Sequence, residues 1–136
     1  MKPINSLAHG MVDYKTSLTL LLAPGMLGFS GKGAANLVPR VMGAGSLVYS
    51  LLTNYELGAK RVIPLKTHLR LDLMSGAMLA AAPWLFGFRR EHDRSTWVPH
   101  VAVGLAEVGI ALASQDRVRP EVSQLAKEHP IEALAA

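Results

Sequence analysis

The sequence contains no cysteine among its 136 residues, and this absence excludes disulfide bonds and thiolate metal sites. Aromatic residues make up only 6% of the chain, too few for the stacking platforms that bind single-stranded nucleic acid. The formal net charge is only +4, and the basic residues are scattered between apolar runs instead of forming a patch. We therefore expect no nucleic-acid partner.

Charged residues are also scarce, at 18%, whereas half of the residues are hydrophobic. The hydrophobic residues form four segments, at about residues 5–29, 37–53, 65–88 and 97–114. A helix of about 17 to 25 residues crosses the core of a lipid bilayer. A soluble four-helix bundle is the alternative, but it would carry a charged face along every helix. Each segment instead holds a stretch without any charge, so the pattern predicts an all-α protein with four transmembrane helices.

The chain repeats itself at a constant offset of 59 residues. The matched pairs are His9 and His68, Asp13 and Asp72, Thr16 and Ser75, Pro24 and Pro83, and Phe29 and Phe88. A fixed period of this kind indicates a tandem duplication, and each copy holds two of the four segments. The prediction is a transmembrane domain at residues 1–115, built from repeats at about 5–56 and 64–115, followed by a polar C-terminal tail at 116–136.

Two spans in each repeat give the repeats a parallel orientation and place both termini on one side of the membrane. We expect the first helix of one repeat to superpose on the first helix of the other, about an axis along the membrane normal. Lys and Arg are slightly more frequent on the side of the termini, which favours termini in the cytoplasm.

The run Pro83-Trp84-Leu85-Phe86-Gly87-Phe88 follows a small residue and resembles the signature of the SPW-repeat family of small bacterial membrane proteins. In that family a Ser-Pro-Trp motif closes the first of the two transmembrane helices in each repeat. Here Ala82 stands in place of the serine, and the first copy reads Ala23-Pro24-Gly25, without serine or tryptophan. The resemblance implies a multi-pass protein of the bacterial inner membrane, and it implies no activity.

The repeated histidine and aspartate are candidate site residues: His9 and Asp13 in the first copy, His68 and Asp72 in the second. A spacing of four places both side chains on one helix face. Two imidazoles and two carboxylates facing one another would suit a divalent cation, and two histidines alone could bind haem. The structural alternative pairs each histidine with the aspartate of its own repeat, near a helix start where the macrodipole favours negative charge. We expect this structural arrangement, directed at protein and without metal or cofactor.

Glu107 is the second candidate, because it lies about 15 Å along its helix from Trp97. An ionisable group at such depth marks a functional site or a specific partner. His100 and Glu107 share one stripe of the predicted helix, so both are expected to face the bundle. Lys15 reaches the same level, and a Lys15–Glu107 pair or a hydroxyl partner for Glu107 is favoured over a proton relay.

Small residues on one face of the second segment predict close helix packing: Gly43, Ser46, Ser50 and Thr53. Trp84 and Trp97 fall at one membrane interface and are typical of aromatic anchors. No set of nucleophile, base and orienting group is evident, so nothing supports an enzyme. The sequence favours a structural or accessory protein that packs with other membrane subunits or with itself. The alternative is a site-bearing protein that binds a cation or haem, or relays protons, through the His/Asp pairs and Glu107.

Overall fold

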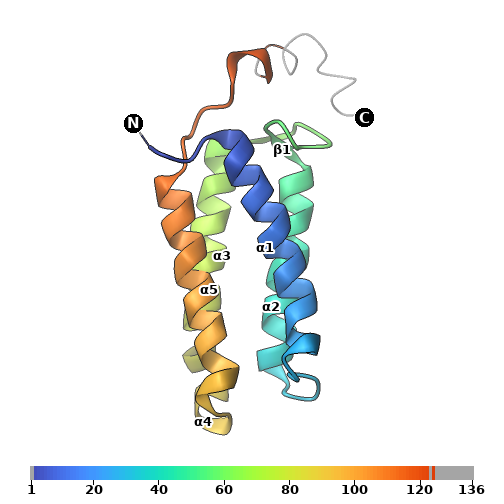
Figure 1. Ribbon diagram of the computed structural model, residues 1–136, viewed down its shortest axis with the longest axis vertical. Helices are drawn as coiled ribbons and strands as arrows, with labels where there is room; N and C mark the ends of the chain where they lie inside the picture. The colour runs from blue at the N-terminus through green and yellow to red at the C-terminus, as the bar shows by residue number, and fades with distance from the viewer. Residues whose placement is uncertain (1, 123, 125–136) are drawn as a thin grey trace.

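Four long helices run side by side in the computed structural model, which describes residues 2–122 and 124 (Figure 1). They are α1 (Ser6–Met26), α2 (Ala34–Leu51), α3 (Leu65–Leu85) and α5 (Arg94–Ala113), and a short helix, α4 (Phe88–Glu91), precedes α5. The two-residue strands β1 (Thr53–Asn54) and β2 (Ile63–Pro64) pair in parallel within the loop between α2 and α3. The all-α class is confirmed, and each long helix begins and ends within three residues of its predicted segment.

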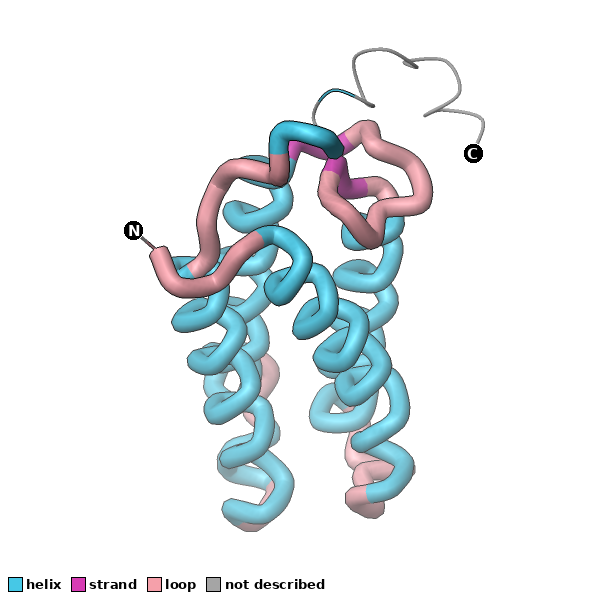
Figure 2. Tube along the Cα trace, turned by 45° about the horizontal axis from the view of Figure 1, so that its top comes forward, coloured by secondary structure: helices cyan, strands magenta, loops and turns pink. Residues whose placement is uncertain are grey.

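The long helices form two hairpins (Figures 1 and 2). Helix α1 packs along α2, and α3 packs along α5, while the hairpins meet mainly through α2 and α3. One end of the bundle holds residues 2–5, the loop at 52–64 and residues 114–122; we call it the cap end (Figure 2). The other end holds the two short connections within the hairpins and is called the turn end. Helices α1 and α2 lie within the first predicted repeat, and α3 and α5 lie within the second.

Glycines allow the closest helix contacts inside both hairpins. A Cβ atom on Gly43 of α2 would lie 2.7 Å from the backbone oxygen of Ser17 on α1. A Cβ atom on Gly76 of α3 would lie 2.7 Å from the backbone oxygen of Gly104 on α5. Because a side chain at either contact would force the helices apart, these small residues serve packing within each hairpin.

Both hairpins leave their first helix through the same Gly-Phe turn. Gly28 and Gly87 have φ angles of +71° and +78°, in the left-handed region that ends many helices and favours glycine. The phenylalanine after each glycine then turns inward, so that Phe29 and Phe88 are only 3% and 1% exposed. The repeated Pro24 and Pro83 lie inside the last turns of α1 and α3.

At the cap end, the chain segment before α1 is hydrogen-bonded to the segment that follows α5. Ile4 forms a β-bridge with Ser114, and the Gln115 N–H donates to the Ile4 oxygen at 2.8 Å. Beneath the loop at 52–64, Tyr55 forms a small buried cluster with Leu65 and Leu69 of α3. Most of the predicted tail at 116–136 lies outside the described residues.

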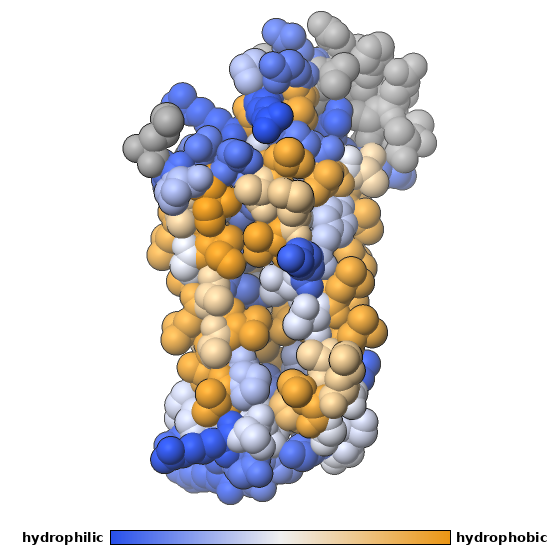
Figure 3. Space-filling view, viewed as in Figure 1, coloured by the Kyte–Doolittle hydropathy of each residue, from blue (hydrophilic) through white to orange (hydrophobic). Residues whose placement is uncertain are grey.

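Large apolar side chains are exposed along all four long helices. Figure 3 shows mainly orange side chains along the length of α1 and α5, between blue ends. By length and composition, α5 is the one described helix that is long and apolar enough to cross a membrane, with a mean hydropathy of 1.4. Helices α1 and α3 carry charged residues in their first halves, and the 18 residues of α2 include Asn36 and Arg40. Four spans therefore stay a prediction.

Candidate functional site

Two pairs of residues converge between the hairpins near the cap end. His9 and Asp13 project from α1, and His68 and Asp72 project from the matching positions of α3. One ligand atom from each of the four residues lies within 4.8 Å of the other three. The histidines are at most 1% exposed and the aspartates 7%. We call these four residues the His/Asp cluster.

The shortest histidine–aspartate distances in the cluster are between residues of different repeats. His9 Nε2 lies 3.0 Å from Asp72 Oδ2, and His68 Nε2 lies 2.9 Å from Asp13 Oδ2. Within the repeats the corresponding distances are 3.4 Å for His9–Asp13 and 3.1 Å for His68–Asp72. The expectation that each histidine pairs with its own aspartate is therefore incomplete, because each Nε2 faces both carboxylates.

The helix macrodipole does not explain the position of the two aspartates. Asp13 and Asp72 each lie seven residues beyond the first residue of their helix, and neither α1 nor α3 has an acidic residue in its first turn. The macrodipole effect falls off within the first turn, so this part of the structural expectation was wrong. The carboxylates are held by side-chain hydrogen bonds instead.

A hydroxyl group binds the far side of each imidazole. Thr53 Oγ1 lies 2.7 Å from His68 Nδ1 and donates to the Tyr49 oxygen at 2.6 Å. Ser114 Oγ lies 2.8 Å from His9 Nδ1 and donates to the Ile110 oxygen at 2.7 Å. Since each hydroxyl gives its one proton to a carbonyl, it must accept from the imidazole, and Nδ1 carries a proton in both histidines. Each Nε2 is thereby turned toward the carboxylates.

Two tyrosines complete the surroundings of the carboxylates. Tyr49 of α2 donates to Asp72 Oδ1 at 2.7 Å, and Tyr55 of the loop lies 3.5 Å from Asp13 Oδ2. Burial raises the pKa of the Tyr55 phenol above its usual range, so the group stays a donor. The Tyr55 ring lies against Gly10, where a Cβ atom would come within 2.8 Å of it.

The sequence pattern did not single out these outer partners. Thr53 was assigned to a packing face, and Tyr49 and Tyr55 carried no signal at all. One clue was available, because Thr53 and Ser114 are hydroxyl residues placed just after the second long helix of each hairpin, 61 residues apart. Matched residues of α1 and α3 are 59 residues apart, whereas Thr53 and Ser114 are 61 apart. A search at one fixed period therefore misses this match.

A model of the SPW repeat domain matches residues 7–114 of the chain. The chain belongs to the SPW-repeat family. Searches of curated proteins and of solved structures found no match. The family assignment confirms the resemblance and indicates a membrane protein, and it brings no named activity.

The tryptophan of the SPW-repeat motif lies at the turn end, far along α3 from the His/Asp cluster. Trp84 is 54% exposed, and its ring meets that of Trp97 edge-on at 6.0 Å. The Arg89 guanidinium lies 5.6 Å and 5.5 Å from the two ring centroids, a favourable cation–π geometry. The first copy has Gly25 at this position, where a Cβ atom would lie 3.2 Å from an Arg40 nitrogen. A guanidinium therefore lies against the site of the missing tryptophan.

Glu107 of α5 lies next to the cluster, beside a small pocket of about 20 Å³ that His9, Asp13 and Asp72 also line. Its Oε2 atom is buried and has no hydrogen-bond partner among the residues that the structure describes. Lys15 is exposed, and although both residues line one cleft, no ion pair joins them within the described part of the chain. The predicted Lys15–Glu107 pair is thus not formed.

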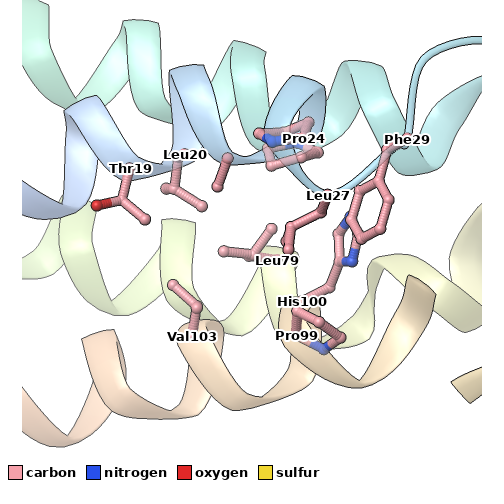
Figure 4. A pocket seen from close by; sticks show the side chains of 11 residues that line it. Thr19, Leu20, Pro24, Leu27, Phe29, Leu79, Pro99, His100 and Val103 are labelled. Carbon is pink, nitrogen blue, oxygen red and sulfur yellow. The ribbon is translucent and has the colours of Figure 1, made fainter. Parts of the chain in front are cut away.

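His100 of α5 links the hairpins at the turn end, as a residue facing the interior. Its Nε2 lies 2.9 Å from the Ala35 oxygen on α2, and its ring packs on the rings of Phe29 and Phe88. Figure 4 shows His100 beside Phe29 at one end of an apolar cavity of about 130 Å³ between the hairpins. The repeated phenylalanines therefore hold a second, separate contact between the repeats.

Proposed function

We propose that this SPW-repeat protein crosses the bacterial inner membrane four times and acts as an accessory subunit. The observation that carries the membrane proposal is the direction of its apolar side chains. Large hydrophobic residues face outward on every long helix, and exposing so much apolar surface to water would be unfavourable in free energy. They include Leu18 and Leu22 of α1, Val41 and Val48 of α2, Met74 and Met78 of α3, and Leu105 and Leu112 of α5.

The acidic residues and histidines of α1 and α3 are compatible with this proposal because they face inward, whereas the basic residues Lys15, Lys66 and Arg70 are exposed. His9, Asp13, His68 and Asp72 lower the hydropathy of their helices, yet all four are buried. Lipid would meet the apolar outer faces instead. Helices α1 and α3 have 21 residues and α5 has 20, which gives lengths of about 30 Å at 1.5 Å per residue. This length matches the hydrocarbon core of a bilayer.

The accessory role is supported by outward-facing small residues that none of the described helices covers. Gly45 of α2 and Gly109 of α5 have open space around them, in contrast to Gly43 and Gly104 in the hairpin contacts. Ala102 and Ala106 of α5 are also exposed. Small residues on a lipid-facing surface allow another helix to approach closely, so a second copy or another membrane subunit would pack there.

Single-cysteine labelling tests the topology directly, because the natural chain has no cysteine. Lys60 at the cap end and Glu91 at the turn end are both exposed, and each is replaced by cysteine in turn. We expect a membrane-impermeant maleimide to label Glu91→Cys in intact cells and Lys60→Cys only after the inner membrane is opened. Labelling of both positions from one side, or recovery of the protein in the soluble fraction, would exclude four spans.

The accessory role is tested by mild detergent extraction followed by size-exclusion chromatography with light scattering. We expect a mass above that of one chain, from self-association or from a co-purifying membrane subunit. A single chain at every detergent and protein concentration would exclude this role without affecting the topology.

A second candidate is a protein with a cation site, and the convergence of the four ligand atoms within 4.8 Å favours it. The haem alternative has no such support. The pocket beside the cluster is about 20 Å³, which has room for a water molecule or an ion but not for a porphyrin.

A further inference from the structure

We propose that the His/Asp cluster binds one divalent transition-metal cation of the Zn²⁺ class. The ligands would be the Nε2 atoms of His9 and His68 and one carboxylate oxygen each from Asp13 and Asp72. This inference rests on the second candidate function and names its ligand. It is independent of the accessory role, since a buried ion between the hairpins leaves their outer faces unchanged.

The distances within the cluster are close to those of a tetrahedral site. Ligand atoms about 2.0–2.2 Å from a tetrahedral ion lie roughly 3.3–3.5 Å from one another. Three nitrogen–oxygen distances, to Asp13 Oδ2 and Asp72 Oδ2, are 2.9, 3.0 and 3.1 Å, and His9 Nε2 lies 3.4 Å from Asp13 Oδ1. One ligand atom from each residue lies within 4.8 Å of the others, so small side-chain movements would convert the hydrogen-bonded arrangement into a coordination shell.

The hydroxyl partners orient both imidazoles as a metal site requires, and metal binding would release the Nε2 protons that bond the carboxylates in the metal-free protein. A histidine ligand needs a lone pair on one nitrogen and usually donates the other N–H to an outer group. Thr53 and Ser114 accept from Nδ1, because each gives its own proton to a main-chain carbonyl. This leaves Nε2 of both rings as the nitrogen that points at the carboxylates. Tyr49 plays the same outer role for Asp72, whose Oδ1 accepts its hydroxyl and leaves Oδ2 for the centre.

A divalent ion also satisfies the charge of the cluster. Two carboxylates buried at 7% exposure are stabilised by two positive charges, which either two imidazolium rings or one divalent cation can supply. A divalent cation with two neutral imidazoles makes the cluster electrically neutral. Imidazole and carboxylate ligands together suit Zn²⁺ and its first-row neighbours, whereas Mg²⁺ and Ca²⁺ prefer oxygen ligands alone.

A route to the buried cluster runs past Glu107. A cleft of about 230 Å³ between α1 and α5 is lined by Lys15, Thr16, Glu107 and Ile110, among others. Thr16, Glu107 and Ile110 also line the small pocket next to the cluster. Glu107 therefore lies between the cleft and the four ligands, and its Oε2, which no described residue binds, can hold an entering cation.

The proposal is tested on full-length protein purified in detergent, stripped with a chelator and titrated with Zn²⁺. We expect one Zn²⁺ per chain, with micromolar or tighter affinity. Co²⁺ in place of Zn²⁺ should give the visible absorption of a four-coordinate ion. The double variant Asp13→Asn with Asp72→Asn keeps the side-chain shapes, and we expect it to lower the Zn²⁺ affinity at least 100-fold. His92→Gln, at the turn end, is the matched control and should bind as the wild type does.

Two further variants keep the test decisive if the double variant does not fold. Thr53→Ala removes only an outer partner and should weaken Zn²⁺ binding about 10- to 100-fold. Glu107→Gln should slow loading while leaving the affinity at equilibrium within a few-fold of the wild type. A wild-type protein that binds no Zn²⁺ or Co²⁺ beyond the buffer control overturns the proposal, and so does unchanged affinity in the aspartate double variant. Because membrane insertion is measured separately, either negative result leaves the four-span proposal standing.

Discussion

At the scale of single residues, the His/Asp cluster is defined by hydrogen bonds that leave no freedom to the histidine rings. Each imidazole has a hydroxyl on one nitrogen and carboxylates on the other, with distances of 2.7–3.0 Å for the closest partners. Because both nitrogens of each buried imidazole have hydrogen-bond partners, replacing any one partner would leave a buried polar atom unpaired. The outer hydroxyls are therefore as much part of the site as the four central residues.

We predict that Thr53→Val destabilises the metal-free protein by about 1–3 kcal/mol, because it leaves His68 Nδ1 without its buried partner. Thr19→Val is the matched control. Thr19 also donates to the carbonyl four residues earlier, at 2.8 Å, but its side chain is exposed and binds no histidine. The free energy of unfolding in a denaturing-detergent titration measures both effects. Equal effects at positions 53 and 19 would show that the contact with His68 contributes nothing.

The site could be predicted from the sequence only in part, and the reason is physical. A spacing of four residues places His9 and Asp13 on one face of a helix, and the repeat offset does the same for His68 and Asp72. Neither observation reveals whether a histidine reaches the aspartate of its own helix or that of the other. That choice depends on how the two hairpins dock, which periodicity within one helix does not encode. The Lys15–Glu107 pairing failed for a related reason, since equal depth does not place two side chains face to face.

At the scale of helices, the repeat offset indicates which positions are equivalent and the structure shows what they do. The helix bounds were predictable because charge-free runs and Gly-Phe turns mark them. The roles of the individual glycines were harder to predict than the helix bounds. Gly43 and Gly104 both lie at close helix contacts, whereas Gly45 and Gly109 face outward on the same two helices. Sequence spacing alone does not separate these two classes, because it does not show which face meets a neighbour.

We predict that Gly104→Ala destabilises the protein by about 1–3 kcal/mol through overpacking. A Cβ atom at position 104 would collide with the Gly76 oxygen and lie 2.9 Å from the Ala80 Cβ. Gly109→Ala, on the same helix with nothing within 4 Å, should not destabilise the protein and should raise its stability by up to about 1 kcal/mol through helix propensity. Thermal unfolding in detergent distinguishes them. A tolerated alanine at position 104 would mean that α3 and α5 can separate there at little cost.

At the scale of the whole molecule, two different contacts join the hairpins at opposite ends. The cap end is joined by the polar His/Asp cluster, and the turn end by His100 between two phenylalanines, with an apolar cavity between the two contacts. Inside a membrane, apolar packing gains little from excluding water, so polar contacts between helices carry more of the association. The duplication thus produced a molecule in which each repeat supplies half of the site that holds it to the other.

The last prediction measures that mutual dependence with double-mutant cycles in metal-free protein. His9→Gln and Asp72→Asn alter residues on different hairpins whose atoms lie 3.0 Å apart, and their effects on the free energy of unfolding should be coupled by about 0.5–3 kcal/mol. The coupling of His9→Gln with Asp13→Asn, on the same helix at 3.4 Å, should be smaller. His9→Gln with His100→Gln joins residues at opposite ends, and their effects should add. If the coupling between His9 and Asp13 exceeded that between His9 and Asp72, each repeat would hold its own pair. The His/Asp cluster would then not stabilise the contact between the two hairpins.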